Sequence, residues 1–473
     1  MSDPREPQQT LKSAPQSVAD HPNESCSDLK FPQGFLWGVS TAAHQVEGGN
    51  NDNQWATWEA AGKIRSGDKC GLACDWWSNA ERDFDLAQQL GINALRLSVE
   101  WSRIEPEPGN FRKEAITRYR QLLRELHQRG IQPFLCLHHF THPKWFEQMG
   151  AFQREESVLA FQRFATRAAH EFGDLCSHWV TFNEPNVYSA LGYVLGEFPP
   201  GKTGHIVAAL NVSNTMARAH ARAYHAIHEI QPGAQVGWAQ HYIVFQPAKA
   251  QSFIDRRLSS LLSYLFNEHF FSAVELGRVG FPFNLLTSDV SDVKGACDFV
   301  GLNVYSRFHV AFRPTSGTLF ADVFVPSDVP QGDRGVDKPY GEAYPAAIRA
   351  AVKRAHQLGK PIYILENGVP DASDRIRPWL IVNATKEIHD LIQSGHDIRG
   401  YFHWTLVDNF EWTEGWKLRF GLIELDPLTQ QRTMRTSGLL YRQIAEANAL
   451  PSGLLTKHQA FDSTQLSDQA SDQ

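Results

Sequence analysis

The stretch HWVTFNEPNVY, residues 178–188, runs from an apolar, β-prone segment into a polar turn. Its aromatic and β-branched residues favour a strand, and Pro185 fixes φ at the first residue of the turn. A short apolar run that ends in turn residues is typical of a strand buried on both faces, as in a parallel sheet. The stretch therefore predicts a buried strand that delivers an amide, Asn183, and a carboxylate, Glu184, to its carboxyl end.

Seven further stretches of this kind occur along the chain, and amphipathic helical patterns lie between them. The eight predicted strands are residues 35–40, 93–101, 131–139, 178–184, 234–242, 297–305, 361–367 and 398–406. The predicted helices are residues 81–91, 114–130, 155–173, 214–230, 344–360 and 377–395. Strands that alternate with helices form right-handed βαβ units and a parallel sheet.

Closing this sheet on itself gives a (β/α)₈ barrel, or TIM barrel, which is the α/β fold that we predict. The alternative is an open, doubly wound sheet. Such a sheet should carry a Gly-rich nucleotide-binding turn after its first strand, and HQVEGGNN, residues 44–51, does not fit that turn.

The chain is expected to contain one domain with a tail at each end. Between Phe31 and about Leu455 there is no linker, repeat or change in composition, so residues 31–455 are assigned to the barrel. Residues 1–30 are rich in Pro, Ser, Gln and Asp, and residues 456–473 are polar and poor in apolar side chains. Both tails are expected to be disordered.

Composition excludes several classes of function. Of the 473 residues, 42% are hydrophobic and 21% charged, which is typical of a soluble globular protein, and the net charge of −7 gives no electrostatic reason to bind nucleic acid or an anionic membrane. No segment reaches membrane-spanning length, and residues 1–30 lack the apolar core of a secretory signal. The six cysteines are scattered and form no disulfide framework. The expected location is therefore the cytoplasm.

Polar side chains gather at the ends of the predicted strands and just beyond them. These residues are Gln45, Arg96, His139, Asn183, Glu184, Asn303, Tyr305, Glu366, Asn367, Trp404, Glu411 and Trp412. In a (β/α)₈ barrel all carboxyl ends of the strands open onto one face, so these residues should converge there. Each one alone could be an ordinary strand-to-loop junction, but that interpretation explains the whole set poorly.

The two glutamates that end apolar strands, Glu184 and Glu366, suggest a reaction. Two partly desolvated carboxyl groups in one cleft cannot both ionise without cost, so one pKa should rise while the other group stays charged. This pairing suits a proton donor that works opposite a nucleophile on an acetal carbon. Taken separately, each motif also fits plain turn chemistry, since Asn-Gly is a favoured turn pair.

Three histidines in LHHFTHP, residues 137–143, raise the alternative of a metal site. The spacing of His138 and His142 would suit a helix, but this segment ends a strand, and no nearby carboxylate completes a ligand set. We therefore expect no metal and no cofactor, and a neutral His139 that donates to a sugar hydroxyl. The tryptophans of HWTLVDNFEWTEGW, residues 403–416, offer flat faces beside Glu411, a combination that fits carbohydrate better than phosphate or a nucleobase.

These motifs together resemble glycoside hydrolase family 1, the β-glucosidase family, over nearly the whole region from Phe31 to about Ala445. The segments that carry the resemblance are FPQGFLWGVSTAAHQVEGG (31–49), LRLSVEWSRIEP (95–106), LHHFTHPKW (137–145), TFNEP (181–185), DFVGLNVYSR (298–307), YILENG (363–368) and GYFHWTLVDNFEWTEGWKLRFGLIELD (400–426). All seven stand in the order found in the family. The resemblance implies a (β/α)₈ barrel and a retaining β-glycosidase.

By this similarity, Glu184 matches the general acid/base and Glu366 the nucleophile, while Arg96 and Tyr305 match the residues that keep the nucleophile charged and oriented. The resemblance implies that the remaining site residues bind the non-reducing sugar. These are Gln45, His139, Asn183, Asn303, Trp404, Glu411, Trp412 and Phe420. The expected partners are small β-glycosides and oligosaccharides, and a homo-oligomer is left open.

The sequence also departs from the family pattern. Leu365 stands where Thr is usual, Trp416 stands where Tyr is common, and Gly341 occupies the place of a frequent Trp platform for the leaving group. The Glu411-Trp412 pair resembles the branch that acts on unphosphorylated sugars, so a 6-phospho-β-glycosidase ranks lower. A sugar-binding pseudoenzyme ranks lower too, because both carboxylates are kept. An enzyme that mainly transglycosylates would use the same residues and remains an alternative.

Overall fold

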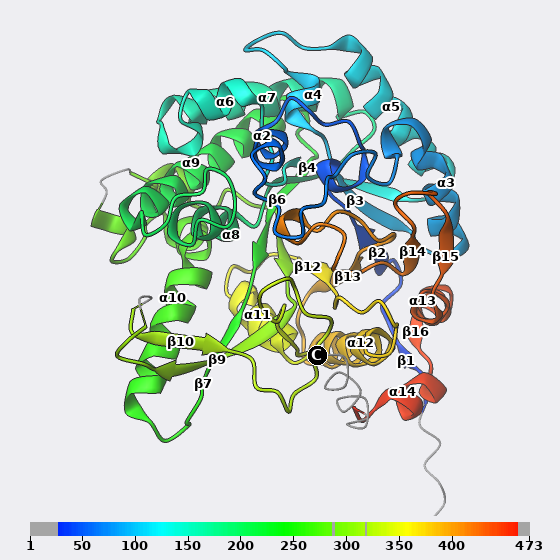
Figure 1. Cartoon of the computed structure of the whole chain (residues 1–473). Helices are drawn as coiled ribbons and strands as arrows, with labels where there is room; N and C mark the ends of the chain where they lie inside the picture. The colour runs from blue at the N-terminus through cyan, green and yellow to red at the C-terminus, as the bar shows by residue number, and fades with distance from the viewer. Residues whose placement is uncertain (1–26, 286–288, 317–318, 462–473) are drawn as a thin grey trace, which may run out of the picture.

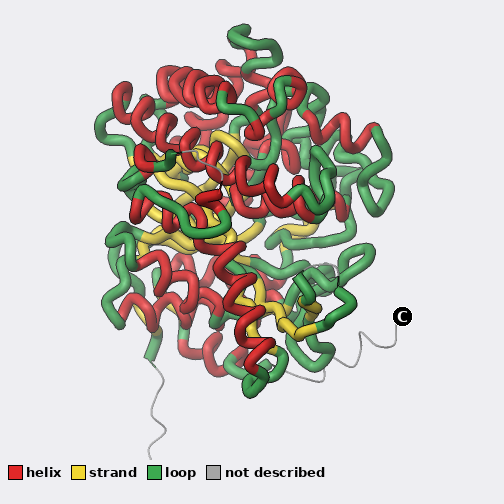
Figure 2. The backbone as a smooth tube through the Cα atoms, turned by 90° about the vertical axis from the view of Figure 1, so that its left-hand side faces the viewer, coloured by secondary structure: helices red, strands yellow, loops and turns green. Residues whose placement is uncertain are grey.

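The computed structural model describes residues 27–285, 289–316 and 319–461. Eight parallel strands close into a barrel, and helices surround it (Figure 1). Figure 2 shows the same arrangement from the side, with the strands in the middle of the molecule and helices around them. The predicted (β/α)₈ barrel is confirmed.

Each of the eight predicted stretches contains one strand of the ring. In the order of the ring, the strands are β12 (Ile362–Asn367), β13 (Ile398–Trp404), β2 (Leu36–Ser40), β3 (Ala94–Ser98), β4 (Gln132–His138), β5 (His178–Asn183), β6 (Gln235–His241) and β8 (Phe299–Asn303). The ring closes between β13 and β2, where the register runs from Gly400 opposite Leu36 to Trp404 opposite Ser40. All polar strand ends therefore face one side of the barrel.

In the described part of the chain, eight helices of ten or more residues form the outer layer, and six of them were expected. They are α3 (Trp76–Gln89), α5 (Lys113–Gln128), α7 (Glu156–Phe172), α9 (Ile206–Ile230), α10 (Phe253–Leu276), α11 (Ala347–His356), α12 (Arg377–Gln393) and α13 (Thr436–Ala447). The sequence pattern missed α10 because some polar side chains of this helix are buried and some apolar ones are exposed. Asp255 and Ser259 are buried, whereas Phe253 and Ile254 are exposed. It also missed α13, whose sequence contains a glycine, Gly438, a residue that disfavours helix.

Shorter helices and strands lie outside the ring of strands. Helices are α1 (Ala43–Val46), α2 (Gln54–Ala60), α4 (Trp101–Ile104), α6 (Lys144–Gln148), α8 (Pro185–Ser189) and α14 (Ser452–His458). Strands are β1 (Leu29–Lys30), β7 (Val244–Pro247), β9 (Ser306–Phe312), β10 (Ala321–Phe324), β11 (Glu342–Ala343), β14 (Ile423–Leu425), β15 (Arg432–Met434) and β16 (Ala449–Leu450). Short 3₁₀ segments lie at Ala151–Gln153, Phe283–Leu285, Ser291–Val293 and Trp412–Glu414, and a π-helical segment lies at Ala190–Val194. Strands β7, β9, β10 and β11 form a second sheet beside the ring (Figure 1).

Described elements extend slightly past both expected domain ends. Leu29 and Lys30, assigned to the first tail, form β1 and pair antiparallel with β16. Residues 456–458, assigned to the second tail, complete α14, and Phe461 packs against Trp379 with ring centroids 5.2 Å apart. Such short pairings leave no periodic signal in a sequence. The rest of the two predicted tails, residues 1–26 and 462–473, lies outside the described residues.

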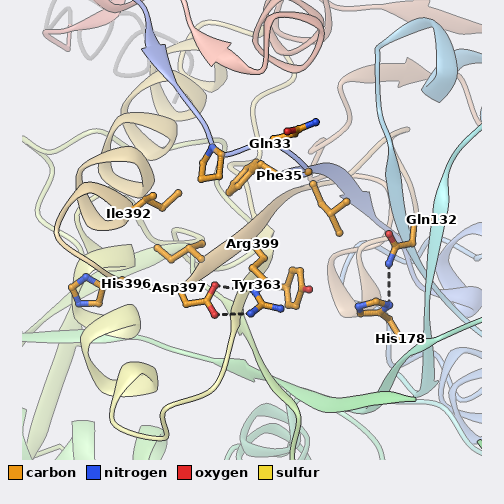
Figure 3. A pocket seen from close by; sticks show the side chains of 13 residues that line it. Gln33, Phe35, Gln132, His178, Tyr363, Ile392, His396, Asp397 and Arg399 are labelled. Carbon is orange, nitrogen blue, oxygen red and sulfur yellow. Dashed lines mark hydrogen bonds and ion pairs between the residues drawn. The ribbon is translucent and has the colours of Figure 1, made fainter. Parts of the chain in front are cut away.

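The barrel is filled rather than hollow. Its interior holds a cluster that includes Phe134, whose ring centroid lies 5.2 Å from that of Tyr363 and 5.0 Å from that of Phe402. A cavity of about 440 Å³ opens at the end where the strands begin, lined by residues such as Gln132 and His178 (Figure 3). It lies opposite the predicted site. Within the described part of the chain, no helix is long and apolar enough to cross a membrane.

Candidate active site

The twelve predicted site residues form one connected group at the carboxyl ends of the strands. They are Gln45, Arg96, His139, Asn183, Glu184, Asn303, Tyr305, Glu366, Trp404, Glu411, Trp412 and Phe420, and all are buried except Glu411, which is partly buried. The charged members stand out, because buried charges are costly unless they are paired.

Glu366 lies at the centre of this group and is 3% exposed. Arg96 Nη2 lies 2.5 Å from its Oε1, and the Tyr305 hydroxyl donates to its Oε2. Burial raises the pKa of Glu366 to about 7, the charge of Glu184 adds to that rise, and Arg96 and Tyr305 oppose it. A cation and a phenolic donor thus favour the ionised carboxylate within an environment that otherwise disfavours it.

A chain of hydrogen bonds joins Glu366 to the second carboxylate. Arg96 Nη1 donates to Asn183 Oδ1 at 2.5 Å, and Asn303 Nδ2 donates both to that oxygen at 3.0 Å and to Glu184 Oε1 at 2.8 Å. The two carboxylates are therefore held in one rigid network that draws on β3, β5, β8 and β12.

Local irregularities in the strands aim both carboxylates at the cleft. In β12, Tyr363 and Leu365 belong to the barrel interior, so strict alternation would turn Glu366 outward. The register of β12 shifts just before Glu366 against both neighbouring strands. Similarly, the pairing of β5 with β6 shifts between Val180 and Asn183. Such irregularities commonly re-aim side chains beside active sites.

The backbone of Glu184 is strained. Its φ of 47° and ψ of 60° lie in the left-handed region, which residues other than glycine rarely adopt. It caps α8, whose first residue is Pro185. The proline fixes the exit of the chain directly after the carboxylate, as the sequence suggested.

The structure assigns a proton position to His139. Arg96 can only donate, so the side-chain oxygen of Asn183 is the atom that faces Arg96. The amide nitrogen of Asn183, Nδ2, then donates to His139 Nε2 at 3.1 Å. Burial, with Arg96 and His138, holds the pKa of His139 well below its usual value. The neutral ring therefore carries its proton on Nδ1, which is buried and has no hydrogen-bond partner among the described residues. The expectation that His139 donates from this nitrogen to a sugar hydroxyl stays a prediction.

The loop after β13 completes the group. Gln45 Nε2 donates to Glu411 Oε2 at 3.3 Å and to the Phe410 carbonyl at 2.8 Å. Burial raises the pKa of Glu411 to about 8, and the charges of Glu366 and Glu184 add to the effect. The loop is anchored by Asp408, whose two carboxylate oxygens each accept from Arg435 at 2.8 Å.

Aromatic rings enclose the same space. The rings of Trp404 and Trp412 lie nearly parallel to that of His139, with centroids 5.9 Å and 5.8 Å away. Phe420 packs edge-on against Tyr305, at 6.3 Å. Flat apolar faces therefore alternate with polar groups, an arrangement suited to a ring-shaped ligand that carries hydroxyls.

Besides atoms of the Arg96–Glu366 ion pair, three buried polar atoms of the group lack a hydrogen-bond partner among the described residues. They are Gln45 Oε1, His139 Nδ1 and Asn303 Oδ1. Unpaired buried polar atoms are costly, and a cluster of them calls for an explanation. Two acceptors and one donor could all be satisfied by the hydroxyls of one bound sugar.

The other histidines of LHHFTHP have protein partners. His138 Nε2 lies 3.3 Å from His142 Nδ1, and His142 Nε2 lies 2.8 Å from Glu147 Oε2. Within the described ranges, no group of three or more His, Cys, Asp and Glu residues could hold a metal ion.

Two residues beside the site, His241 and Tyr340, were not identified from the sequence. His241 Nδ1 lies 2.8 Å from Glu184 Oε1, and the ring of Tyr340 lies 5.0 Å from that of Phe420. A signal for His241 existed, because Gly237, Ala239 and His241 alternate along β6 and share its inward face. Tyr340 lies in an irregular loop, where no periodicity applies.

Comparison with known proteins gives a consistent result. Residues 27–450 match the family model described as Glycosyl hydrolase family 1. Beta-glucosidase A of Thermotoga maritima is 31% identical over 450 residues, covering 89% of this chain and 99% of that protein. A beta-galactosidase of Sulfolobus acidocaldarius is 29% identical, covering 90% and 97%. The solved beta-glycosidase from Pyrococcus horikoshii superposes with a TM-score of 0.82 at 34% identity, covering 92% and 99%.

Proposed function

The chain belongs to glycosyl hydrolase family 1, and from this premise we propose that it is a retaining β-glucosidase that also accepts β-galactosides and β-fucosides. The observation that carries the proposal is the pair of buried carboxylates, Glu184 and Glu366, joined through Arg96, Asn183 and Asn303. Glycoside hydrolysis requires two carboxyl groups with separate roles.

In the first step, Glu366 attacks the anomeric carbon of the substrate. The bond from that carbon to the leaving group breaks, and its electron pair stays with the glycosidic oxygen, which takes the proton of Glu184. The product of this step is a covalent glycosyl-enzyme. Arg96 and Tyr305 favour the charged Glu366 that the attack needs.

In the second step, a water oxygen attacks the same carbon while Glu184 takes a proton from it. The bond to Glu366 breaks, and the electron pair returns to its carboxylate. Two displacements restore the original configuration. Proton NMR of the reaction with an aryl β-glucoside tests this, because β-glucose should appear first; α-glucose as the first product would exclude the proposed mechanism.

The unpaired polar atoms and the aromatic rings support sugar binding. Gln45 Oε1 and Asn303 Oδ1 would accept from hydroxyls, and His139 Nδ1 would donate to one. Asn183 would serve the 2-hydroxyl, whose hydrogen bond strengthens as positive charge develops on the ring. A carboxylate such as Glu411 accepts from either epimer at the 4-hydroxyl, which is why we include galactosides and fucosides.

The pH profile of kcat/KM provides a test of the Tyr305 contact. Burial raises the pKa of Glu366 to about 7, and Glu366 attacks only when ionised, so kcat/KM should fall as the pH drops through this value. Tyr305→Phe removes a hydrogen bond that favours the ionised form. We therefore expect the acid limb of kcat/KM to move upward by roughly one pH unit.

Tyr340→Phe is the matched control for Tyr305→Phe. The two rings are neighbours, with centroids 6.0 Å apart, but the hydrogen bond to Glu366 comes from Tyr305. An acid limb that stays in place in Tyr305→Phe, or that moves equally in both variants, would show that this hydroxyl does not tune the nucleophile.

A further inference from the structure

The histidine at the end of β6, His241, is held firmly beside Glu184. Its Nδ1 lies 2.8 Å from Glu184 Oε1. Its ring stacks on Tyr305, with centroids 5.7 Å apart and planes at 19°, and the ring of Phe266 meets it edge-on at 5.8 Å. The His241 carbonyl accepts from Asn186 Nδ2 at 2.9 Å. Both the ring and the backbone of His241 are thus fixed.

The two oxygens of Glu184 have different surroundings. Oε1 is contacted by His241 Nδ1 and by Asn303 Nδ2, each at 2.8 Å. The Asn303 amide nitrogen can only donate. Oε2 has no hydrogen-bond partner in the described part of the chain. A proton on Glu184 therefore belongs on Oε2, which is left for the substrate.

We propose that His241 is a positioning residue for Glu184. Its Nδ1–H donates to Oε1 and so reserves Oε2 as the atom that gives the proton to the leaving oxygen and later takes one from water. This inference rests on the proposed function. It adds a role for His241 that the family resemblance did not assign.

The charged groups around His241 support a donor at Nδ1. Burial lowers its pKa, but Glu184 and, more weakly, Glu366 outweigh burial, and the net pKa is raised. The Tyr305 hydroxyl, which faces the ring from the segment after β8, stays neutral because burial holds its pKa well above the usual value. The N–H of His241 therefore lies among two carboxyl groups and a neutral phenol.

This hydrogen bond strengthens during the first step. Glu184 becomes a carboxylate when its proton moves to the leaving oxygen. A hydrogen bond to a charged oxygen is roughly twice as strong as a hydrogen bond to a neutral oxygen. His241 thus favours proton donation. Its contribution should matter for leaving groups that need protonation and little for those that depart as stable anions.

A matched pair of substitutions isolates the donor. Asparagine carries its Nδ2 the same number of bonds from the backbone as histidine carries Nδ1, whereas leucine has the same shape as asparagine without a donor. In His241→Leu, kcat/KM for an alkyl β-glucoside should fall roughly 10- to 100-fold, the worth of a hydrogen bond to a charged group. For 2,4-dinitrophenyl β-glucoside it should change less than about 3-fold, since this step then needs little acid assistance. His241→Asn should restore most of the loss.

A double substitution with Glu184→Ala provides the decisive measurement. If His241 acts through Glu184, then His241→Leu should lower kcat/KM no further once Glu184 is absent. Equal losses on both substrates, or additive losses in the double variant, would overturn the positioning role. If instead Glu184→Ala itself shows no dependence on the leaving group, the proposed function fails at Glu184, and this result is distinct from a failure at His241.

Discussion

Glu366→Ala should lower kcat for aryl β-glucosides by roughly 10⁴- to 10⁶-fold, the range seen when the nucleophile or base of a covalent mechanism is removed. No other carboxylate of the site has both an arginine at 2.5 Å and a tyrosine hydroxyl as partners, at least within the part of the chain that the structure describes. The alanine leaves a small space beside the anomeric carbon. Azide can enter this space and attack the anomeric carbon from the face of the sugar that Glu366 would attack. The product should therefore be the α-glycosyl azide.

The matched control is Glu366→Gln. Its amide fills the space of the carboxylate and is a poor nucleophile, so this variant should be equally inactive and azide should not restore it. Turnover is measured by release of the aryl group, and the azide product by NMR. A Glu366→Ala enzyme with unchanged turnover, or one that yields the β-glycosyl azide, would contradict the role of Glu366.

Glu184→Ala should produce a loss that depends on the leaving group. Substrates that need protonation should lose roughly 10²- to 10⁴-fold in kcat/KM, the usual worth of a general acid, while dinitrophenyl glycosides should lose far less. The second step also loses its base. Azide, which needs no base, should accelerate that step and give the β-glycosyl azide, because here it attacks the glycosyl-enzyme rather than the substrate.

A series of aryl β-glucosides with graded phenol pKa values measures this effect. The slope of log kcat/KM against the phenol pKa should be steep in Glu184→Ala and shallow in the unmodified enzyme. Ser189, in the helix that follows Glu184, offers a control: Ser189→Ala removes a hydrogen bond to the Asn186 carbonyl but no carboxyl group. Parallel slopes in Glu184→Ala and the unmodified enzyme would refute the acid role.

Much of the fold could be predicted because it follows from local pattern. Each ring strand is a short apolar run with a turn at its end, and this signal survives in a single sequence. Convergence of the strand ends then follows from barrel geometry alone, which is why Arg96 and Glu366, 270 positions apart, were expected together. By contrast, α10 buries Asp255 and exposes Phe253, so tertiary contacts override the amphipathic pattern there.

The details of the site needed the structure. Strict alternation along β12 would turn Glu366 away from the cleft. The register shift that precedes Glu366 places this carboxylate beside Arg96 instead. A shift of register depends on the neighbouring strands and leaves no mark in the strand itself. His241 could have been found by counting alternate positions from Gly237, but nothing in the sequence says that its partner is Glu184.

At Glu184, the strained backbone conformation brings catalytic activity and folding stability into conflict. Glycine adopts a φ of 47° freely, whereas a glutamate there costs on the order of 1–3 kcal/mol. Every glutamate codon is one base away from a glycine codon, so an inactive chain without this backbone strain lies one mutation away. Heat or proteolysis alone, applied as selection without a demand for turnover, does not select against the loss of the carboxylate. Improvement of this protein by directed evolution should therefore screen stability and turnover together at every round.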